Sequence, residues 1–166
     1  MIRDYKSSDL ESRINIWYQE NITAHSFIKK EYWEKNYKLV KNAIPAAKIF
    51  VYEQNGEIIG FIGITGNYIA GIFVKQQYHN CGIGTLLIKK AKEVIPGLYL
   101  NVYLKNKSAV KFYKRHGFTI IKTLRNYETL EKEHVMFWKP SLRRKKINPY
   151  RRIAAVVNNS GWREKA

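Results

Sequence analysis

Two glycines, Gly82 and Gly84, stand in the segment HNCGIGTLLIKKAKE (residues 79–93), where an apolar run ends and a helical pattern begins. Glycine in a helix costs about 1 kcal/mol relative to alanine, so a special backbone conformation or a close approach is expected here. Glycines at a strand-to-helix turn let the main chain lie against a ligand. The free N–H groups and the dipole of the helix then favour an anion, typically phosphate. A tight turn packed closely on a sheet is the alternative that this spacing leaves open.

The single cysteine, Cys81, lies in the same segment. One cysteine excludes an internal disulfide and a multi-cysteine zinc site, and a reducing, cytoplasmic setting is the simplest interpretation. We expect no metal. A covalent acyl-cysteine step is disfavoured, because the sequence shows no His–Asp pattern that would activate the thiol.

The composition predicts one globular domain with a basic surface. The 166 residues are 45% hydrophobic and carry 30 Lys and Arg against 13 Asp and Glu, a net charge of +17. Such a surface attracts polyanions, although a solvated basic surface is an equally good interpretation. We expect no transmembrane span or signal peptide, because no apolar run is long enough. Residues 141–166 form a basic tail, interpreted as disordered, as a short docked helix or as an extension, and residues 1–140 as the domain.

Periodicity predicts the elements that position the glycine segment. Strand patterns occupy residues 2–5, 46–54, 57–65, 68–74, 98–104, 118–128 and 134–139, and helical patterns occupy 7–22, 31–44, 83–95 and 108–117. Asn55-Gly56 is a strong hairpin signal between the second and third strands. We expect Ser8 and Glu11 to form a capping box, Ser108 to cap the last helix and Gly117 to end it.

The order of these elements predicts a mixed α/β domain. Its first part is antiparallel, and a parallel crossover runs through the glycine-bearing helix. Four apolar residues should form the buried face of that helix: Ile83, Leu87, Ala91 and Val94.

Two segments in this order carry a family resemblance. IFVKQQYHNCGIGTLLIKKA resembles the acetyl-coenzyme A pyrophosphate loop of the GNAT superfamily of N-acetyltransferases, usually written Q/R-x-x-G-x-G/A. NVYLKNKSAVKFYKRHGF resembles the second signature of the family, in which an asparagine precedes a helix that ends in Phe-Tyr-x-x-x-Gly-Phe. HSFIKKEYW, near residue 30, resembles the branch of small bacterial YiaC- and YjaB-type members. The resemblance covers about residues 1–139 and implies a GNAT fold, a twisted mixed sheet of about seven strands with about four helices.

The loop departs from the family pattern at two positions. His79 stands where Gln or Arg is common, and Asn80 replaces a frequent glycine. A histidine can still donate to phosphate, and asparagine tolerates a left-handed backbone better than most residues.

The resemblance implies an enzyme that transfers the acetyl group of acetyl-CoA directly to a primary amine in a ternary complex. Tyr113 would be the general acid beside the sulfur, the backbone amide of Phe73 would polarise the thioester carbonyl, and Asn106 would bind the pantetheine or neighbouring backbone. The implied cofactor-binding set is Ile72, Phe73, Val74, His79, Asn80, Cys81, Gly82, Ile83, Gly84, Thr85, Asn106, Ala109, Phe112 and Tyr113.

The sequence indicates the acceptor-binding residues less clearly than the cofactor-binding residues. His25, between the first two helices, is a candidate base or acceptor contact, with a helix-linking role as its alternative. An acceptor site would draw on His25, Phe27, Tyr32, Trp33, Tyr68 and Tyr103. The acceptor could be a protein lysine, an N-terminal amine or a small-molecule amine. Two alternatives remain: toxin-type acetylation of aminoacyl-tRNA, and a non-catalytic GNAT-fold module that binds nucleic acid or a protein. The expected state is a monomer or homodimer.

Overall fold

The computed structural model describes residues 1–43 and 47–141 of the chain, so the expectations for the tail from residue 142 onward lie outside the described residues. The strands are β1 (Ile2–Asp4), β2 (Lys48–Gln54), β3 (Glu57–Thr65), β4 (Tyr68–Val74), β5 (Leu98–Tyr103), β6 (Thr119–Arg125) and β7 (Lys132–Trp138). The helices are α1 (Leu10–Ala24), α2 (Lys30–Ala43), α3 (Ile83–Val94) and α4 (Lys107–Arg115), with 3-10 turns η1 (Ser7–Asp9) and η3 (Gln76–Tyr78). The predicted mixed α/β fold and element order are confirmed.

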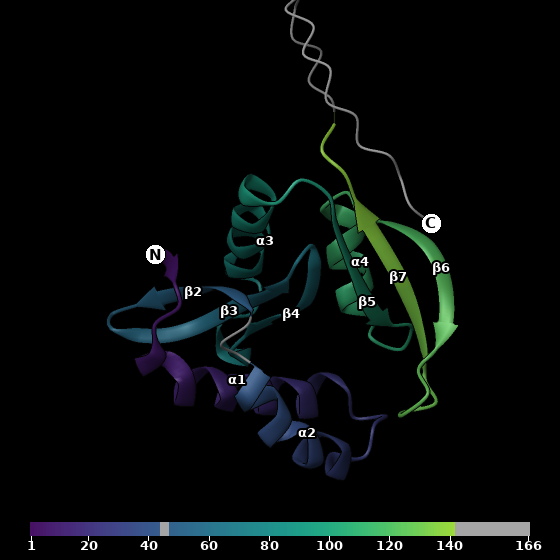
Figure 1. The fold of residues 1–166 in the computed structure, drawn as a ribbon, viewed down its shortest axis with the longest axis horizontal. Coiled ribbons are helices and arrows are strands. Elements are labelled where there is room, and N and C mark those ends of the chain that lie inside the picture. The colour runs from purple at the N-terminus through teal and green to yellow at the C-terminus, as the bar shows by residue number, and fades with distance from the viewer. Residues whose placement is uncertain (44–46, 142–166) are drawn as a thin grey trace, which may run out of the picture.

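The strands form one sheet in the order β1-β2-β3-β4-β5-β7-β6, and the four helices cover its two faces. Helices α1 and α2 lie on one face, and α3 and α4 lie on the other (Figure 1). Each face has its own core. The core under α3 and α4 is built around Ile62, Leu87, Ile88, Leu100 and Met136. The core under α1 and α2 is built around Ile14, Trp17, Trp33, Val51 and Phe61.

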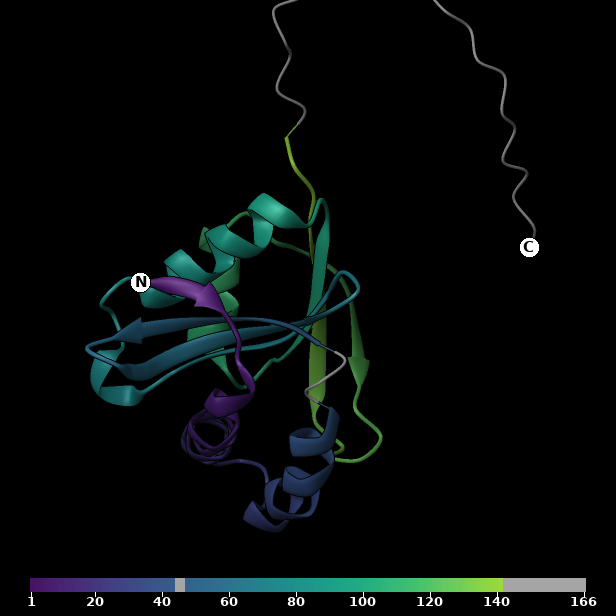
Figure 2. The same cartoon turned by 60° about the vertical axis from the view of Figure 1, so that its left-hand side comes forward.

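The junction between β4 and β5 positions the candidate site. The two strands run parallel but share one register pair, Tyr68 with Tyr99, and β5 and β7 stand at a steep angle to β2–β4 (Figure 2). In β4, Gly71 pairs with Gly63 and Ile69 pairs with Ile64, so Ala70 is an extra residue that bends the strand. Beyond Tyr68 the main chains of β4 and β5 therefore diverge toward their C-terminal ends.

The turns predicted at Asn55-Gly56 and Gly117 are confirmed, whereas the helix caps predicted at Ser8 and Ser108 are wrong. Asn55 and Gly56 have φ of 52° and 79°, as a two-residue hairpin requires, and Gly117 has φ of 77°. The capping box of Ser8 and Glu11 is wrong, because Ser8 lies within η1 and the carboxylate that caps this turn belongs to Asp9.

Two further local predictions are wrong. Asn106, not Ser108, is the N-cap of α4: its side-chain oxygen accepts from Ala109 N at 3.2 Å. Val94 is 38% exposed, and the buried face of α3 uses Ile88 instead, because the helix packs on the sheet through its central turns.

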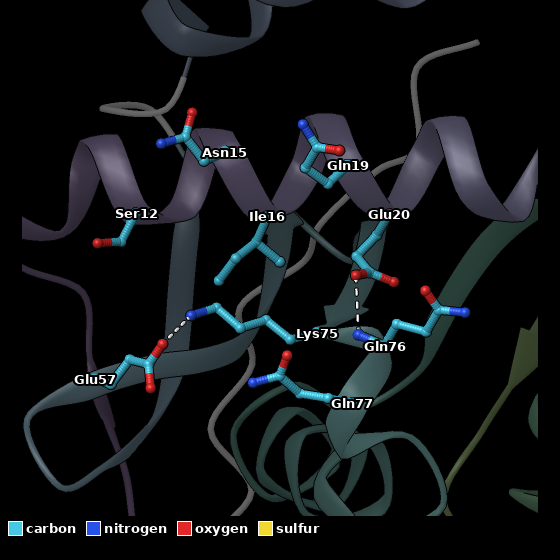
Figure 3. Close-up of a pocket in the computed structure, with 9 residues that line it drawn as sticks. All are labelled: Ser12, Asn15, Ile16, Gln19, Glu20, Glu57, Lys75, Gln76 and Gln77. Carbon is cyan, nitrogen blue, oxygen red and sulfur yellow. Dashed lines mark hydrogen bonds and ion pairs between the residues drawn. The ribbon is translucent and has the colours of Figure 1, made fainter.

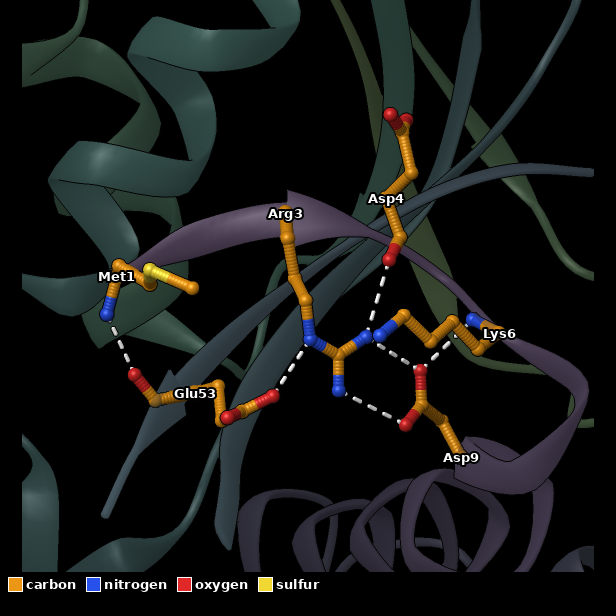
Figure 4. Close-up of polar contacts among 6 residues, drawn as sticks. All are labelled: Met1, Arg3, Asp4, Lys6, Asp9 and Glu53. Carbon is orange, nitrogen blue, oxygen red and sulfur yellow. Dashed lines mark hydrogen bonds and ion pairs between the residues drawn. The ribbon is translucent and has the colours of Figure 1, made fainter. Parts of the chain in front are cut away.

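Two arginines of the N-terminal segment have opposite environments. Arg3 on β1 donates to both carboxylate oxygens of Asp9, at 2.7 and 2.9 Å, and to Glu53 on β2 at 2.5 Å (Figure 4). Arg13 on α1 is 4% exposed, and two of its nitrogens, Nε and Nη2, are buried without a hydrogen-bond partner. Its guanidinium lies over the rings of Tyr5 and Phe61. Burial lowers the pKa of Arg13 to about 10.

Arg13→Met should therefore raise the free energy of unfolding by about 1–2 kcal/mol, because it removes a buried charge that has no carboxylate partner within the described residues. Urea unfolding at neutral pH measures this change. Arg3→Met is the matched control and should lower the free energy of unfolding, since it leaves the carboxylates of Asp9 and Glu53 without their arginine partner. A less stable Arg13→Met protein would show that the two ring contacts outweigh the burial of the charge.

Candidate functional site

The loop between η3 and α3 presents free main-chain amides. Asn80 and Gly82 adopt left-handed conformations with φ of 62° and 80°. Leu86 N donates to Gly82 O, which starts the helix, so the amides of residues 83–85 have no acceptor within α3. A Cβ on Gly82 would meet nothing within 4 Å. The loop thus combines unpaired N–H groups with open space, the geometry that suits a phosphate.

The two glycines serve different purposes. Gly82 is needed for its left-handed backbone, which a side chain would strain. Gly84 has a different role: a Cβ there would lie 3.3 Å from the ring of Phe112, so it lets α3 and α4 pack closely. The close approach at Gly84 is thus to a helix, not to the sheet as the tight-turn alternative expected. Asn80 occupies the left-handed conformation that its side chain tolerates.

His79 ties the loop to α1. Its Nε2 lies 2.6 Å from Val74 O and 3.2 Å from Glu20 Oε2. The other oxygen of Glu20 accepts from Gln76 N at 3.0 Å. Figure 3 shows Glu20 beside a cavity of about 490 Å³ between α1 and the end of β4. In this conformation the imidazole Nε2 is engaged by protein atoms, so His79 must turn if it is to donate to phosphate.

The main chain of β4 alternates between its two neighbours. Lys75 N donates to Ile59 O, and the Phe73 carbonyl comes within 2.7 Å of a Cβ built on Gly60, so both residues face β3. In an extended strand the N–H and C=O of Ile72 and Val74 must then face the diverging side toward β5. The amide of Phe73 is therefore directed away from the expected thioester position. The groups that could contact a ligand along this edge belong to Ile72 and Val74.

Tyr113 on α4 is 8% exposed and packs between Phe112 and Phe118. Burial raises the pKa of Tyr113, and the nearby Tyr68 adds to the rise. Tyr68, which contributes to this rise, is the first residue of β4 and pairs with Tyr99 of β5. Its hydroxyl stays protonated at neutral pH, as a proton donor requires.

His25 and Asn106 form a contact across 81 residues. Because Asn106 Oδ1 accepts from Ala109 N, its Nδ2 faces His25 Nε2, at 3.2 Å, and donates to it. Burial lowers the pKa of His25 to about 4, and its buried Nδ1 has no hydrogen-bond partner in the described part of the chain. The lone pair of His25 Nε2, which a general base would use, already accepts the hydrogen bond from Asn106. This geometry favours the helix-linking alternative for His25.

Five of the six expected acceptor residues come together as an aromatic cluster. The ring of His25 stacks on Trp33 at 5.3 Å and meets Phe27 and Tyr103 edge-on, and Tyr32 packs edge-on against Trp33. Tyr68 is separate and packs on Tyr99 at the strand junction. The cluster lies at the C-terminal end of β5, on the face covered by α1 and α2.

Sequence reasoning missed the carboxylates beside this cluster. Tyr32 donates to Glu128 Oε2 at 3.0 Å, and Glu133 on β7 is 8% exposed opposite Tyr103. No local signal separates Glu133 from its exposed neighbours in the sequence, because strand pairing alone brings it to the site. Cys81 lies on the exposed loop, where its sulfur contacts His79 O at 3.6 Å.

Residues 1–43 and 47–141 contain neither a membrane-spanning helix nor a metal-binding cluster. None of their helices is long and apolar enough to cross a membrane. None of their His, Cys, Asp and Glu side chains form a group of three or more that could hold a metal ion.

Comparisons with known proteins agree with this geometry. The family described as acetyltransferase (GNAT) domain matches residues 45–120. The peptidyl-lysine N-acetyltransferase YiaC of Escherichia coli is 34% identical over 140 residues, which are 83% of this chain and 96% of YiaC. The solution structure of apo YjaB from E. coli superposes with a TM-score of 0.72 at 25% identity, covering 82% of this chain and 95% of YjaB. A Bacillus anthracis protein assigned as a streptothricin acetyltransferase, solved with acetyl coenzyme A, is 29% identical with a TM-score of 0.52, covering 57% and 63% of the two chains.

Proposed function

Because the chain belongs to the GNAT family of N-acetyltransferases, we propose that it transfers the acetyl group of acetyl-CoA to the side-chain amine of a protein lysine. One observation carries the proposal. A free-amide loop and a buried tyrosine flank the diverging β4 and β5 strands, in a chain that matches a peptidyl-lysine acetyltransferase over nearly that relative's whole length. The acceptor class comes from this relative.

The loop of residues 79–85 would hold the pyrophosphate. Its unpaired amides and the N-terminal dipole of α3 supply the attraction, and the open space at Gly82 admits the ligand. The pantetheine would run along the edge of β4, hydrogen-bonded to the main chain of Ile72 and Val74. His79 already contacts Val74 O, which leaves the second lone pair of that carbonyl for the pantetheine.

Acetyl-CoA supplies an activated thioester, and the chain's own groups orient it and move protons. We place the polarising amide at Ile72 or Val74, whose N–H groups face the strand junction. The lysine ammonium would lose a proton to water, its free amine would form the new bond to the acetyl carbon, and Tyr113 would donate its proton to the sulfur that departs. Asn106 would act mainly through structure, since its side chain caps α4 and fixes His25.

Acetyl-CoA at 100 times its Kd should stabilise the protein by about 2.7 kcal/mol, which corresponds to a rise in Tm of about 5–10 °C. A thermal melt with and without ligand measures this shift. ATP and inorganic phosphate are the controls, because they test whether any phosphate suffices. An unchanged Tm would remove the coenzyme site from the proposal.

Peptide acetylation tests the acceptor. One peptide carries a blocked N-terminus and a single internal lysine, and the other carries a free N-terminus and no lysine. Acetyl-CoA should produce an acetylated mass only with the first peptide. Modification of the second peptide alone would identify an N-terminal acetyltransferase and contradict the proposed acceptor.

A further inference from the structure

Glu133 is a buried carboxylate that lacks a cationic partner in the part of the chain that the structure describes. Its two oxygens each accept one long amide hydrogen bond, from Asn101 Nδ2 and Asn126 Nδ2, both at 3.3 Å. A carboxylate offers about four lone-pair sites, so roughly half of its capacity is unused. Buried charges are normally paired, and this chain has an excess of 17 positive charges from which a partner could have come.

Strand pairing fixes the direction of this carboxylate. Glu133 on β7 pairs with Tyr103 on β5, and alternation along β5 places Asn101 and Tyr103 on the same face. Tyr103 belongs to the core under α1 and α2, whereas Leu100 and Val102 belong to the opposite core. Glu133 therefore lies on the face that carries the aromatic cluster.

The carboxylate also lies near the strand junction. Burial raises the pKa values of Tyr32, Tyr68 and Tyr103, and the negative charge of Glu133 contributes to the rise in each. Burial is the main cause of the raised pKa of Tyr113, and Tyr68 adds to the rise. Glu133 Oε2 accepts from Asn101, which is two residues along β5 from Tyr99, the partner of Tyr68 at the junction.

We propose that Glu133 binds the ammonium group of the acceptor, a lysine side chain, and orients its nitrogen toward the junction of β4 and β5. The unused lone pairs of the carboxylate accept N–H bonds from the ammonium, which supplies the missing cation. The aromatic cluster contacts the aliphatic part of the lysine, and its ring faces attract the positive charge. This assignment rests on the proposed function, and it gives the acceptor a contact that His25 does not provide.

The turn between β6 and β7 supports this role. Asn126 Oδ1 accepts from the amides of Glu128 and Thr129, at 2.9 and 3.0 Å, which leaves its Nδ2 directed at Glu133. Tyr32 of α2 is bonded to Glu128 of the same turn. Asn101 on β5 and Asn126 in the turn therefore hold the carboxylate of Glu133 from two sides, and Tyr32 joins α2 to the same turn.

The first test is the kinetics of Glu133→Gln with the blocked lysine peptide. The KM for the peptide should rise about 10- to 100-fold, whereas the KM for acetyl-CoA and the acetyl-CoA-dependent shift in Tm should stay within about twofold of wild type. Glu131→Gln is the matched control. Its carboxylate bonds Lys105 at 2.8 Å, and both kinetic constants should remain unchanged.

The second test measures binding without turnover. Two inhibitor peptides carry either Nε,Nε-dimethyllysine, a cation without an acetylatable N–H, or the neutral norleucine at the lysine position. The wild-type protein should bind the cationic peptide at least tenfold more tightly, and Glu133→Gln should lose this preference. If Glu133 only stabilised the fold, Glu133→Gln would weaken the binding of both peptides equally.

The outcomes separate the two proposals. Equal binding of the two peptides by the wild type, or a preserved preference in Glu133→Gln, would overturn the role of Glu133. A preference that depends on Glu133, together with no acetylation of any lysine peptide, would support the ammonium site and contradict the proposed reaction. A variant that loses the acetyl-CoA shift in Tm is misfolded, and Glu133→Asp then serves as the test, with the cationic preference expected to be retained.

Discussion

Tyr113→Phe should lower kcat by about 100-fold or more while changing the KM for acetyl-CoA by less than about threefold. Removing a positioned proton donor affects the step in which the sulfur departs, and general acid catalysis typically contributes 10²–10⁴-fold. The ring contacts with Phe112 and Phe118 are retained in the variant, so its stability should stay close to that of the wild type. Steady-state kinetics with a lysine peptide measure the effect.

Tyr127→Phe is the control for this prediction. Tyr127 is 95% exposed on the turn between β6 and β7, so loss of its hydroxyl should leave kcat unchanged. Because burial raises the pKa of Tyr113, its proton is retained through neutral and mildly alkaline pH. Unchanged kinetics in Tyr113→Phe would remove this residue from the mechanism and leave water as the proton donor.

Gly60→Ala should destabilise the protein by about 3 kcal/mol and lower Tm by about 6–12 °C. The added Cβ would lie 2.7 Å from the carbonyl oxygen of Phe73 and 3.2 Å from Val74 Cα. These are main-chain atoms of the neighbouring strand, so no side-chain rotation relieves the contact. The strands β3 and β4 must move apart, and the edge of β4 that is proposed to bind pantetheine moves with them.

Gly63→Ala provides the comparison on the same strand. A Cβ at Gly63 meets no atom within 4 Å, so this variant should remain within about 0.5 kcal/mol of wild type. Thermal melts of the two variants side by side measure the difference. If Gly63→Ala proved as harmful as Gly60→Ala, backbone entropy or strand propensity would be responsible, and the steric argument would be wrong.

The loss of acetyl-CoA binding in Gly60→Ala can be separated from unfolding. At a temperature well below its Tm, the variant should still show a folded circular-dichroism spectrum and a weaker affinity for acetyl-CoA. This connection follows because the added Cβ contacts Phe73 O and Val74 Cα, and Val74 also belongs to the proposed binding edge.

Local patterns predicted the elements of this protein because their causes are local. Asn55-Gly56 specifies a hairpin through the left-handed conformations that these two residues tolerate. The alternation of apolar residues marked the strands, and the glycine loop and the asparagine-to-tyrosine segment carried the family resemblance. Caps were predicted less well, because Asp9 accepts from Lys6 N and Asn106 accepts from Ala109 N, whereas Ser8 and Ser108 lie within the turns that they were expected to cap.

The order of strands and helices, the loop that begins α3 and the family therefore follow from residues that are neighbours along the chain. Which functional groups meet depends on how the chain folds. The ladder between β3 and β4 turned the amide of Phe73 away from the junction, and folding joined His25 to Asn106 across 81 residues. Pairing of β5 with β7 buried Glu133 beside Tyr103, with no cationic partner among residues 1–43 and 47–141. Such contacts depend on register and on the side of the sheet that each residue faces, and both are set by partners far along the chain.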